Sequence, residues 1–225
     1  MHKFFSQKHT GVILAFFIFY LWAFHLLETR GVRTLHIIHT SLDDLIPFCE
    51  YFIVPYLLWF FYVAAAVVYF AFFQNNKKEY WQFVISLGIG MGAFLLVSWC
   101  YPNGHNLRPV LEGEGNAFRE MVKILYRVDT PTNILPSIHV FNSLAVAVAL
   151  DRCQSLRKHL VLRKASWILS VLIILSTMFL KQHSVADVCW GTALYGAVYL
   201  AVYARAADRS AQRARGRGGW LQGDF

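Results

Sequence analysis

The sequence predicts an all-α fold, a polytopic membrane bundle of about six transmembrane helices. Of the 225 residues, 57% are hydrophobic and 15% are charged, whereas a soluble domain has about 45–50% and about 25%. The apolar residues form runs that approach or exceed the roughly 18 residues expected of a membrane-spanning helix. The basic residues lie in short segments between these runs. We therefore expect one membrane domain and no separate soluble domain.

The elements follow from the hydrophobic runs and the polar segments between them. The first run shows no small-residue cleavage site, so we interpret it as a retained helix. The fourth run is short, and the second is long enough to tilt in the bilayer. A long polar loop, residues 101–135, separates the third and fourth runs. The six expected spans are residues 11–27, 46–73, 81–99, 136–150, 165–180 and 185–204.

We assign residues 1–204 to a single transmembrane domain and residues 205–225 to a basic, disordered tail. The net charge of +8 is better explained by lipid headgroups and membrane orientation than by nucleic acid, for which no reader motif is present. The four cysteines have no metal-binding spacing.

The charge distribution predicts the orientation of the chain. With the N-terminus inside, 14 of the 21 Lys and Arg residues fall on the inner side, in agreement with the positive-inside rule. Both termini are then cytoplasmic. The loop at 101–135 and the turn between the last two spans share the outer face, and a plasma-membrane location is expected.

Three polar stretches should meet at that outer face, because each lies at a helix end. They are Asn106-Leu107-Arg108-Pro109, Leu135-Pro136-Ser137-Ile138-His139 and Lys181-Gln182-His183-Ser184-Val185-Ala186-Asp187. Ionisable residues at such positions in a membrane protein are candidates for function.

These residue types match the needs of phosphate-ester cleavage. Arg108 offers a planar fork for phosphate oxygens, and backbone N–H groups near Ser137 would face an anion at a helix start. His183 and Asp187 are four residues apart and share a helix face, so Asp187 can orient one ring nitrogen of His183 and leave the other free to attack. His139 can protonate the leaving group.

Simpler interpretations exist for each residue taken alone. His139 could be a packed interfacial histidine, Asp187 a helix cap and Arg108 a lipid-headgroup ligand. Asp43 and Asp44 could hold a divalent ion, although helix capping explains them better.

Taken together, the stretches resemble the signature of the type 2 phosphatidic acid phosphatase superfamily. That superfamily includes vanadium haloperoxidases and is related to sphingolipid synthases. Its pattern is Lys-x6-Arg-Pro, Pro-Ser-Gly-His and Ser-Arg-x5-His-x3-Asp. The present chain supplies Arg108-Pro109, Pro136-Ser137-x-His139, and Ser176 followed by His183 and Asp187. The resemblance spans about residues 99–191. It implies a haloperoxidase-like six-helix core, a phosphohistidine intermediate on His183, His139 as general acid, Asp187 as the orienting group, and chemistry that needs no metal or cofactor.

The departures from this pattern remove two cations. Tyr101 stands at the Lys position, Thr177 at the Arg position and Ile138 at the Gly position. We expect Lys181 to replace one missing cation, so that Arg108, Ser137, Lys181 and Tyr101 form the candidate phosphate site. Fewer cations favour a singly charged phosphate group over a doubly charged monoester.

The function expected from these observations is hydrolysis of a membrane lipid phosphate at the extracytoplasmic face. One alternative is a lipid headgroup phosphotransferase of the inositol phosphorylceramide or sphingomyelin synthase kind, in which another alcohol replaces water. A further alternative is a non-enzymatic transporter or scaffold. The sequence specifies neither the lipid nor the oligomeric state.

Overall fold

The computed structural model of the chain describes residues 8–31 and 34–204. Apart from a pair of two-residue strands, its regular elements are helical. Five helices in this part of the chain are long and apolar enough to cross a membrane. They are Gly11–Thr29, Glu50–Phe73, Lys77–Cys100, Leu160–Phe179 and Val185–Ala204. The predicted membrane bundle is therefore confirmed, with bounds close to the hydrophobic runs, and the basic tail lies outside the described residues.

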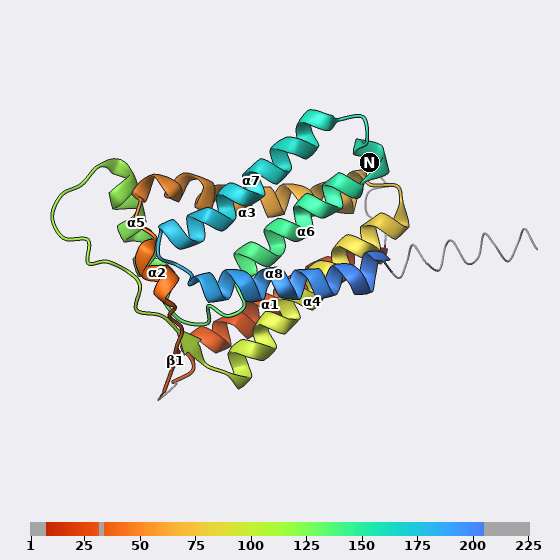
Figure 1. Cartoon of the computed structure of the whole chain (residues 1–225). Helices are drawn as coiled ribbons and strands as arrows, with labels where there is room; N and C mark the ends of the chain where they lie inside the picture. Colours follow the sequence, from red (N-terminus) through yellow and green to blue (C-terminus); the bar gives the residue numbers. More distant parts are fainter. Residues whose placement is uncertain (1–7, 32–33, 205–225) are drawn as a thin grey trace, which may run out of the picture.

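The main helices run side by side (Figure 1). In chain order they are α1 (Lys8–Thr29), α2 (Ser41–Leu45), α3 (Ile53–Val68), α4 (Lys77–Cys100), α5 (Ala117–Val128), α6 (Ile138–Arg152), α7 (Leu160–Phe179) and α8 (Val185–Tyr199). Short 3₁₀ turns at Glu50–Phe52 and Gln154–Leu156 precede α3 and follow α6, and π-helical turns at Tyr69–Phe73 and Leu200–Ala204 extend α3 and α8.

The fourth expected span is the short helix α6. Its 15 residues extend only about 22 Å at 1.5 Å per residue, less than the roughly 30 Å of bilayer hydrocarbon. It packs against α3, α4, α7 and α8, and most of its side chains are buried. A helix enclosed by other helices does not have to match the bilayer thickness, which explains why this run is both short and less apolar.

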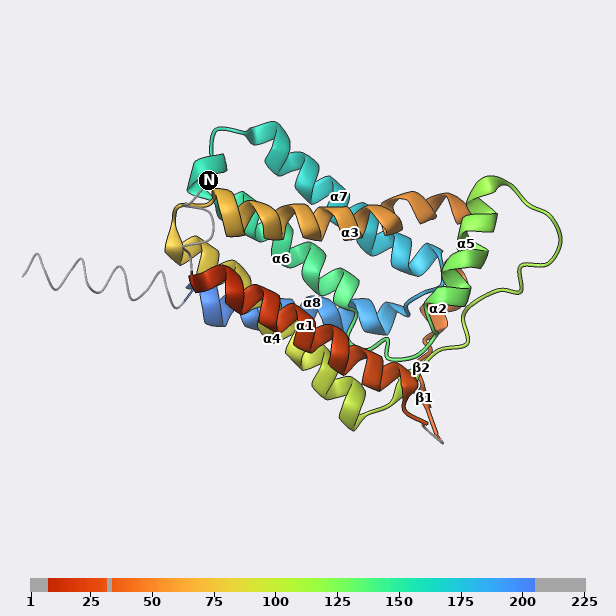
Figure 2. The same ribbon diagram turned by 180° about the vertical axis from the view of Figure 1, so that it is seen from behind.

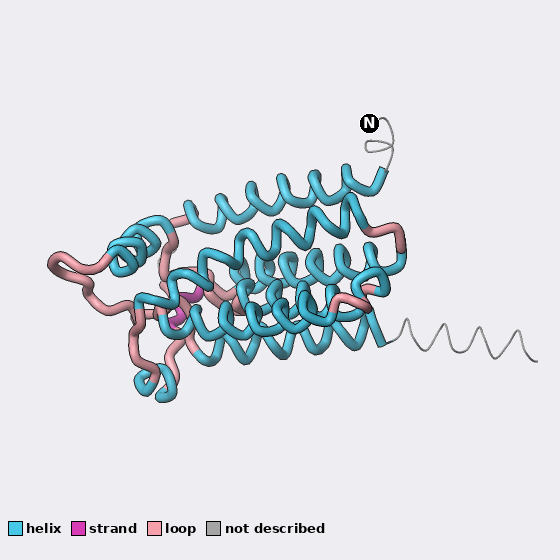
Figure 3. The backbone as a smooth tube through the Cα atoms, turned by 90° about the horizontal axis from the view of Figure 1, so that it is seen from above, coloured by secondary structure: helices cyan, strands magenta, loops and turns pink. Residues whose placement is uncertain are grey.

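Most of the polar connections gather at one end of the bundle. Figures 1 and 2 show α2, α5 and the strands at the end opposite to that where α1 begins and α8 ends. Viewed from above, the longest loop also lies at this end (Figure 3). Helix α5 packs there against α3, with Val122 buried beside Ile53 and Tyr56.

A short parallel strand pair fixes the loops at this end of the bundle. Strand β1 (His36–Ile37) pairs in parallel with β2 (Asn103–Gly104). The buried side chain of Asn103 accepts hydrogen bonds from the amides of Ile134 and Leu135, each at 2.9 Å. The chain entering α6 is thereby tied to the segment that precedes Arg108.

Candidate active site

The first turn of α8 fixes one side of the site. Ser184 is the N-cap, and its Oγ accepts a hydrogen bond from the amide of Ala186 at 3.1 Å. Asp187 Oδ2 accepts in return from the Ser184 amide at 2.8 Å. This reciprocal capping box satisfies helix-end donors. The capping interpretation of Asp187 is therefore correct, and it leaves the carboxylate rigidly placed.

The same carboxylate lies beside His183. Asp187 Oδ2 is 3.5 Å from His183 Nδ1, longer than a normal hydrogen bond. Asp187 is fully buried and His183 is 6% exposed. Contacts of this kind often tighten when a substrate binds, and an orienting role for Asp187 stays a prediction.

The second histidine lies on the other side of His183. His183 Nε2 is 3.4 Å from His139 Nδ1, so the two rings and the carboxylate form a line from α8 to α6. The His139 ring packs between Tyr56 and Trp59, with centroid distances of 4.7 and 4.3 Å. Its Nε2 is buried and has no hydrogen-bond partner among the described residues. A free, enclosed ring nitrogen is available for proton transfer.

Ser137 begins α6 as its N-cap. Its Oγ accepts a hydrogen bond from the Val140 amide at 3.4 Å, and its own amide lies 3.3 Å from the Asp187 carbonyl oxygen, which accepts from it. The side chain thus holds the helix start and links α6 to α8. A direct contact of Ser137 with substrate stays a prediction.

Gly191 allows α8 to approach α6 at this point. A Cβ atom added there would lie 2.8 Å from the Ser137 carbonyl oxygen and 3.2 Å from Val140 Cβ. Both are shorter than ordinary van der Waals contact, so any side chain at this position must push the helices apart.

We expect Gly191→Ala to lower the free energy of unfolding by about 1–3 kcal/mol, the usual cost of overpacking. Gly196→Ala is the matched control, because it lies on the same helix and its Cβ would meet nothing within 4 Å. Denaturant titration in detergent compares the two. Equal effects of both substitutions would show that the close helix approach at Gly191 contributes nothing.

Arg108 reaches the site from the loop after α4. Its Nη1 donates to the carbonyl oxygens of Tyr126 and Asp129, at 3.2 and 2.8 Å, and its Nη2 donates to Gln182 Oε1. The guanidinium stacks over the Tyr126 ring at 4.6 Å. Nε is buried without a partner among the described residues. Arg108 is therefore held firmly, with the Nε–Nη2 side of its fork least engaged.

Asp129 and Tyr56 form a pair close to Arg108. Tyr56 donates its hydroxyl hydrogen to Asp129 Oδ2 at 2.9 Å. Burial raises the pKa of Asp129, while the Tyr56 hydroxyl and the nearby His183 and Arg108 side chains act to lower it. Sequence patterns did not single out either residue, because one lies inside an apolar helix and the other at the end of an amphipathic one.

Lys181 and Tyr101, the other two predicted phosphate ligands, contact residues other than His139 and His183. The Lys181 ammonium donates to the carbonyl oxygens of Asp43, at 2.7 Å, and Ile46. The Tyr101 ring stacks on His36, with centroids 4.1 Å apart. Thr177, at the position of the missing Arg, is buried in α7, and its carbonyl oxygen accepts from the amides of Gln182 and His183. A direct phosphate contact by Lys181 or Tyr101 stays a prediction.

Asp43 clamps α2 onto the start of α8. Its carboxylate accepts hydrogen bonds from Ser184 Oγ and from the amides of Val185 and Thr40, each at 2.7 Å. Burial alone would raise the pKa of Asp43, but these hydrogen bonds outweigh it and lower the pKa below its ordinary value of 3.8. The capping interpretation of Asp43 is thereby supported, with α8 as well as α2 as the helix that it caps.

We expect Asp43→Ala to lower the free energy of unfolding by about 3 kcal/mol, since it leaves buried donors without an acceptor. Because the folded pKa is depressed, the Asp43 contribution is complete well above pH 3.8 and is lost as the pH falls through the folded value. Asp44→Ala is the control, since Asp44 makes only an exposed contact with His39. Unfolding measured across this pH range would contradict the clamp if both variants behaved alike.

Two buried side chains of the site were missed by the sequence patterns. His105 lies in the loop before Arg108 and Gln182 precedes His183, and both are 3% exposed. In the sequence, the only signal for either residue is that it is polar and lies next to a motif. Within residues 8–31 and 34–204, no three His, Cys, Asp or Glu side chains are grouped so as to hold a metal ion.

These observations define an integral membrane protein of the helical-bundle class, with two histidines and a carboxylate in line at one end. A family model described as the PAP2 superfamily matches residues 36–201. The chain therefore belongs to the PAP2 superfamily, as the motif resemblance indicated. No curated protein and no solved structure gave a significant match.

Proposed function

We propose that the protein is an integral membrane lipid-phosphate phosphohydrolase that acts through a phosphohistidine intermediate. Membership of a superfamily whose members are generally phosphatases supports this proposal. The observation that carries it is the line of Asp187, His183 and His139, with 3.5 and 3.4 Å between neighbouring polar atoms. Such a line is the arrangement of an oriented nucleophile and a proton donor.

In the first half of the proposed reaction, the lone pair of His183 Nε2 attacks phosphorus. The bond from phosphorus to the lipid alcohol oxygen breaks as the N–P bond forms, and protonated His139 gives that oxygen its proton. Asp187 holds the His183 ring through Nδ1 and stabilises the positive charge that develops on it.

In the second half, a water molecule attacks the phosphohistidine. His139, now neutral, accepts a proton from this water, the N–P bond breaks, and inorganic phosphate leaves for a monoester substrate. His183 and protonated His139 are then regenerated. Both halves place the phosphoryl group between the two rings and Arg108, the cation whose Nη2 is hydrogen-bonded to Gln182, the residue before His183.

The position of the site at one end of the bundle suits a lipid headgroup at the membrane boundary. With both termini cytoplasmic, this end faces the outside of the cell membrane. Phosphatidic acid, phosphatidylglycerol phosphate and undecaprenyl diphosphate are candidate substrates by resemblance to the superfamily alone. No nucleic acid partner is expected.

A second candidate function uses the same intermediate but passes the phosphoryl group to another alcohol. The low exposure of His139, His183 and Asp187 favours it, because a closed site restricts water and protects a reactive intermediate. The product would be a lipid with an exchanged headgroup, as in the sphingolipid synthases.

A product assay tests the proposal and separates these candidates. Purified protein in detergent is given lipids labelled in the phosphate, with and without alcohol acceptors. Label in inorganic phosphate, or in the phosphate monoester that a diester releases, supports hydrolysis when it is independent of added alcohol, whereas label that moves to the acceptor supports transfer. Absence of any labelled product from a broad panel would contradict both and favour a transporter or scaffold.

A further inference from the structure

Buried hydrogen-bond donors without partners gather around Arg108. Among the described residues, Arg108 Nε, His105 Nε2 and Gln182 Nε2 are all buried and donate no hydrogen bond of normal geometry, although the Gln182 backbone lies close enough to influence the His105 ring. An unsatisfied buried donor costs about 1–3 kcal/mol, and native proteins contain few of them. Three in one place indicate a site whose acceptor arrives with a ligand.

The environment of His105 fixes which of its nitrogens carries the proton. Its Nδ1 accepts a hydrogen bond from the Leu107 amide at 3.1 Å, so in the neutral ring the proton is on Nε2. Burial, together with the nearby His183 and Arg108 side chains, lowers the pKa of His105 to about 4, although the Gln182 backbone and Asp43 act in the opposite direction. His105 is therefore a neutral donor at physiological pH.

Gln182 is oriented in the same way by its own contact. Its Oε1 accepts from Arg108 Nη2, so the amide group presents Nε2 and its two hydrogens to the space beside it. The residue lies directly before His183, and its hydrogen bond from Arg108 connects it to the loop that also carries His105, three residues before Arg108.

We propose that His105 and Gln182 complete the phosphate-binding site together with Arg108, each donating a hydrogen bond to a nonbridging phosphate oxygen. These two neutral donors take the roles of the two cations that the superfamily pattern has and this chain lacks. Since Asp129 also opposes the charge of Arg108, the site carries little net positive charge. It therefore favours a singly charged phosphodiester group over a dianionic monoester. This inference rests on the proposed function for its location but concerns binding alone.

The test measures binding in a form of the full chain that cannot turn over. In a His183→Gln background, calorimetry at mildly alkaline pH compares short-chain phosphatidylmethanol, a monoanionic diester, with short-chain phosphatidic acid. We expect the diester to bind more tightly. His105→Leu should weaken its binding about tenfold, the effect of one lost hydrogen bond to a charged group. Gln182→Glu should weaken it more, because a carboxylate of the same shape replaces the donor by a negative charge.

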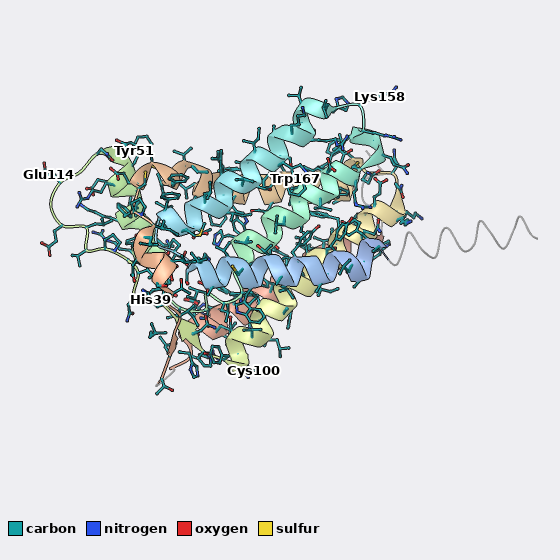
Figure 4. All side chains as sticks on the ribbon, viewed as in Figure 1. His39, Tyr51, Cys100, Glu114, Lys158 and Trp167 are labelled. Atoms are coloured by element: carbon teal, nitrogen blue, oxygen red, sulfur yellow. The ribbon has the colours of Figure 1, made fainter. Side chains whose placement is uncertain are left out.

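Conservative variants distinguish the loss of a hydrogen-bond donor from a loss of the folded state. His105→Gln keeps an N–H donor and should restore most of the affinity that His105→Leu loses. His39→Leu is the matched control, since His39 lies at the same end of the molecule on its surface (Figure 4). The affinity of this variant for the diester should equal that of the His183→Gln background. Unfolding temperatures report whether each variant is folded.

The outcomes are distinct. Unchanged binding in folded His105→Leu and Gln182→Glu, equal loss in His105→Leu and His105→Gln, or tighter binding of phosphatidic acid than of the diester would overturn the inference. A chain that binds the diester through His105 and Gln182, yet converts no lipid with His183 intact, would refute the proposed function and leave this binding site standing.

Discussion

His183→Ala should reduce lipid-phosphate turnover by about 10⁴-fold or more, since loss of a covalent nucleophile commonly has effects of this size. The reason is that the buried Asp187 and His139 side chains remain, but no atom is left to attack phosphorus. Phosphate release from the best substrate of the panel, measured on purified protein, gives the ratio.

The control for this substitution is His39→Ala, another histidine at the same end of the bundle with an exposed side chain. We expect its turnover to match that of the unaltered chain. If His183→Ala kept more than a tenth of the activity while remaining folded, a nucleophilic role for His183 would be excluded.

His139→Ala should lower turnover of natural lipids about 10²–10⁴-fold, the range for removing a general acid. The loss should depend on the leaving group. An alkoxide leaves poorly without a proton, whereas a nitrophenolate leaves readily, so a nitrophenyl phosphate ester should recover much of the lost rate in the first half-reaction.

The contrast with His183→Ala makes this prediction specific. His183→Ala should be equally inactive toward both leaving groups, because attack itself is lost. Tyr56→Phe serves as a packing control, since it keeps the ring against His139 and removes only the hydroxyl that binds Asp129. Equal losses for alkyl and nitrophenyl esters in His139→Ala would assign His139 a structural role.

The sequence was sufficient to predict the fold class because bilayer-length apolar runs leave few alternatives to helices. One element has an environment that the sequence did not indicate. The run at 136–150 forms α6, which is only 15 residues long and is enclosed by α3, α4, α7 and α8. Hydropathy does not distinguish a helix buried by protein from one buried by lipid, so this difference could not be read from composition.

The site was predictable where its residues lie within motifs and not elsewhere. Arg108, His139, His183 and Asp187 come together at one end of the bundle through direct contacts or through Gln182. The prediction for Lys181 rests on proximity in sequence; in the structure this residue has a left-handed backbone (φ 53°), and its ammonium donates to the carbonyls of Asp43 and Ile46. Loop conformations of this kind depend on long-range hydrogen bonds that sequence spacing does not specify.

The burial of His105 and Asp43 could not be predicted from the sequence either. Each lies in a connecting segment whose path is set by the β1–β2 pairing or by contacts with α8. Neither has a periodic pattern around it that would mark it as buried. Their positions follow from the tertiary arrangement, and only their burial reveals that they belong to the site.

Direct detection of the covalent intermediate is the most decisive measurement. Protein mixed with a lipid labelled in its phosphate is quenched within the first turnover under alkaline conditions, digested and analysed by mass spectrometry. We expect an acid-labile phosphoryl group on the peptide that contains His183, absent in His183→Ala and reduced in Asp187→Asn. Turnover with no phosphoryl group on His183, or with the label on another residue, would contradict the mechanism.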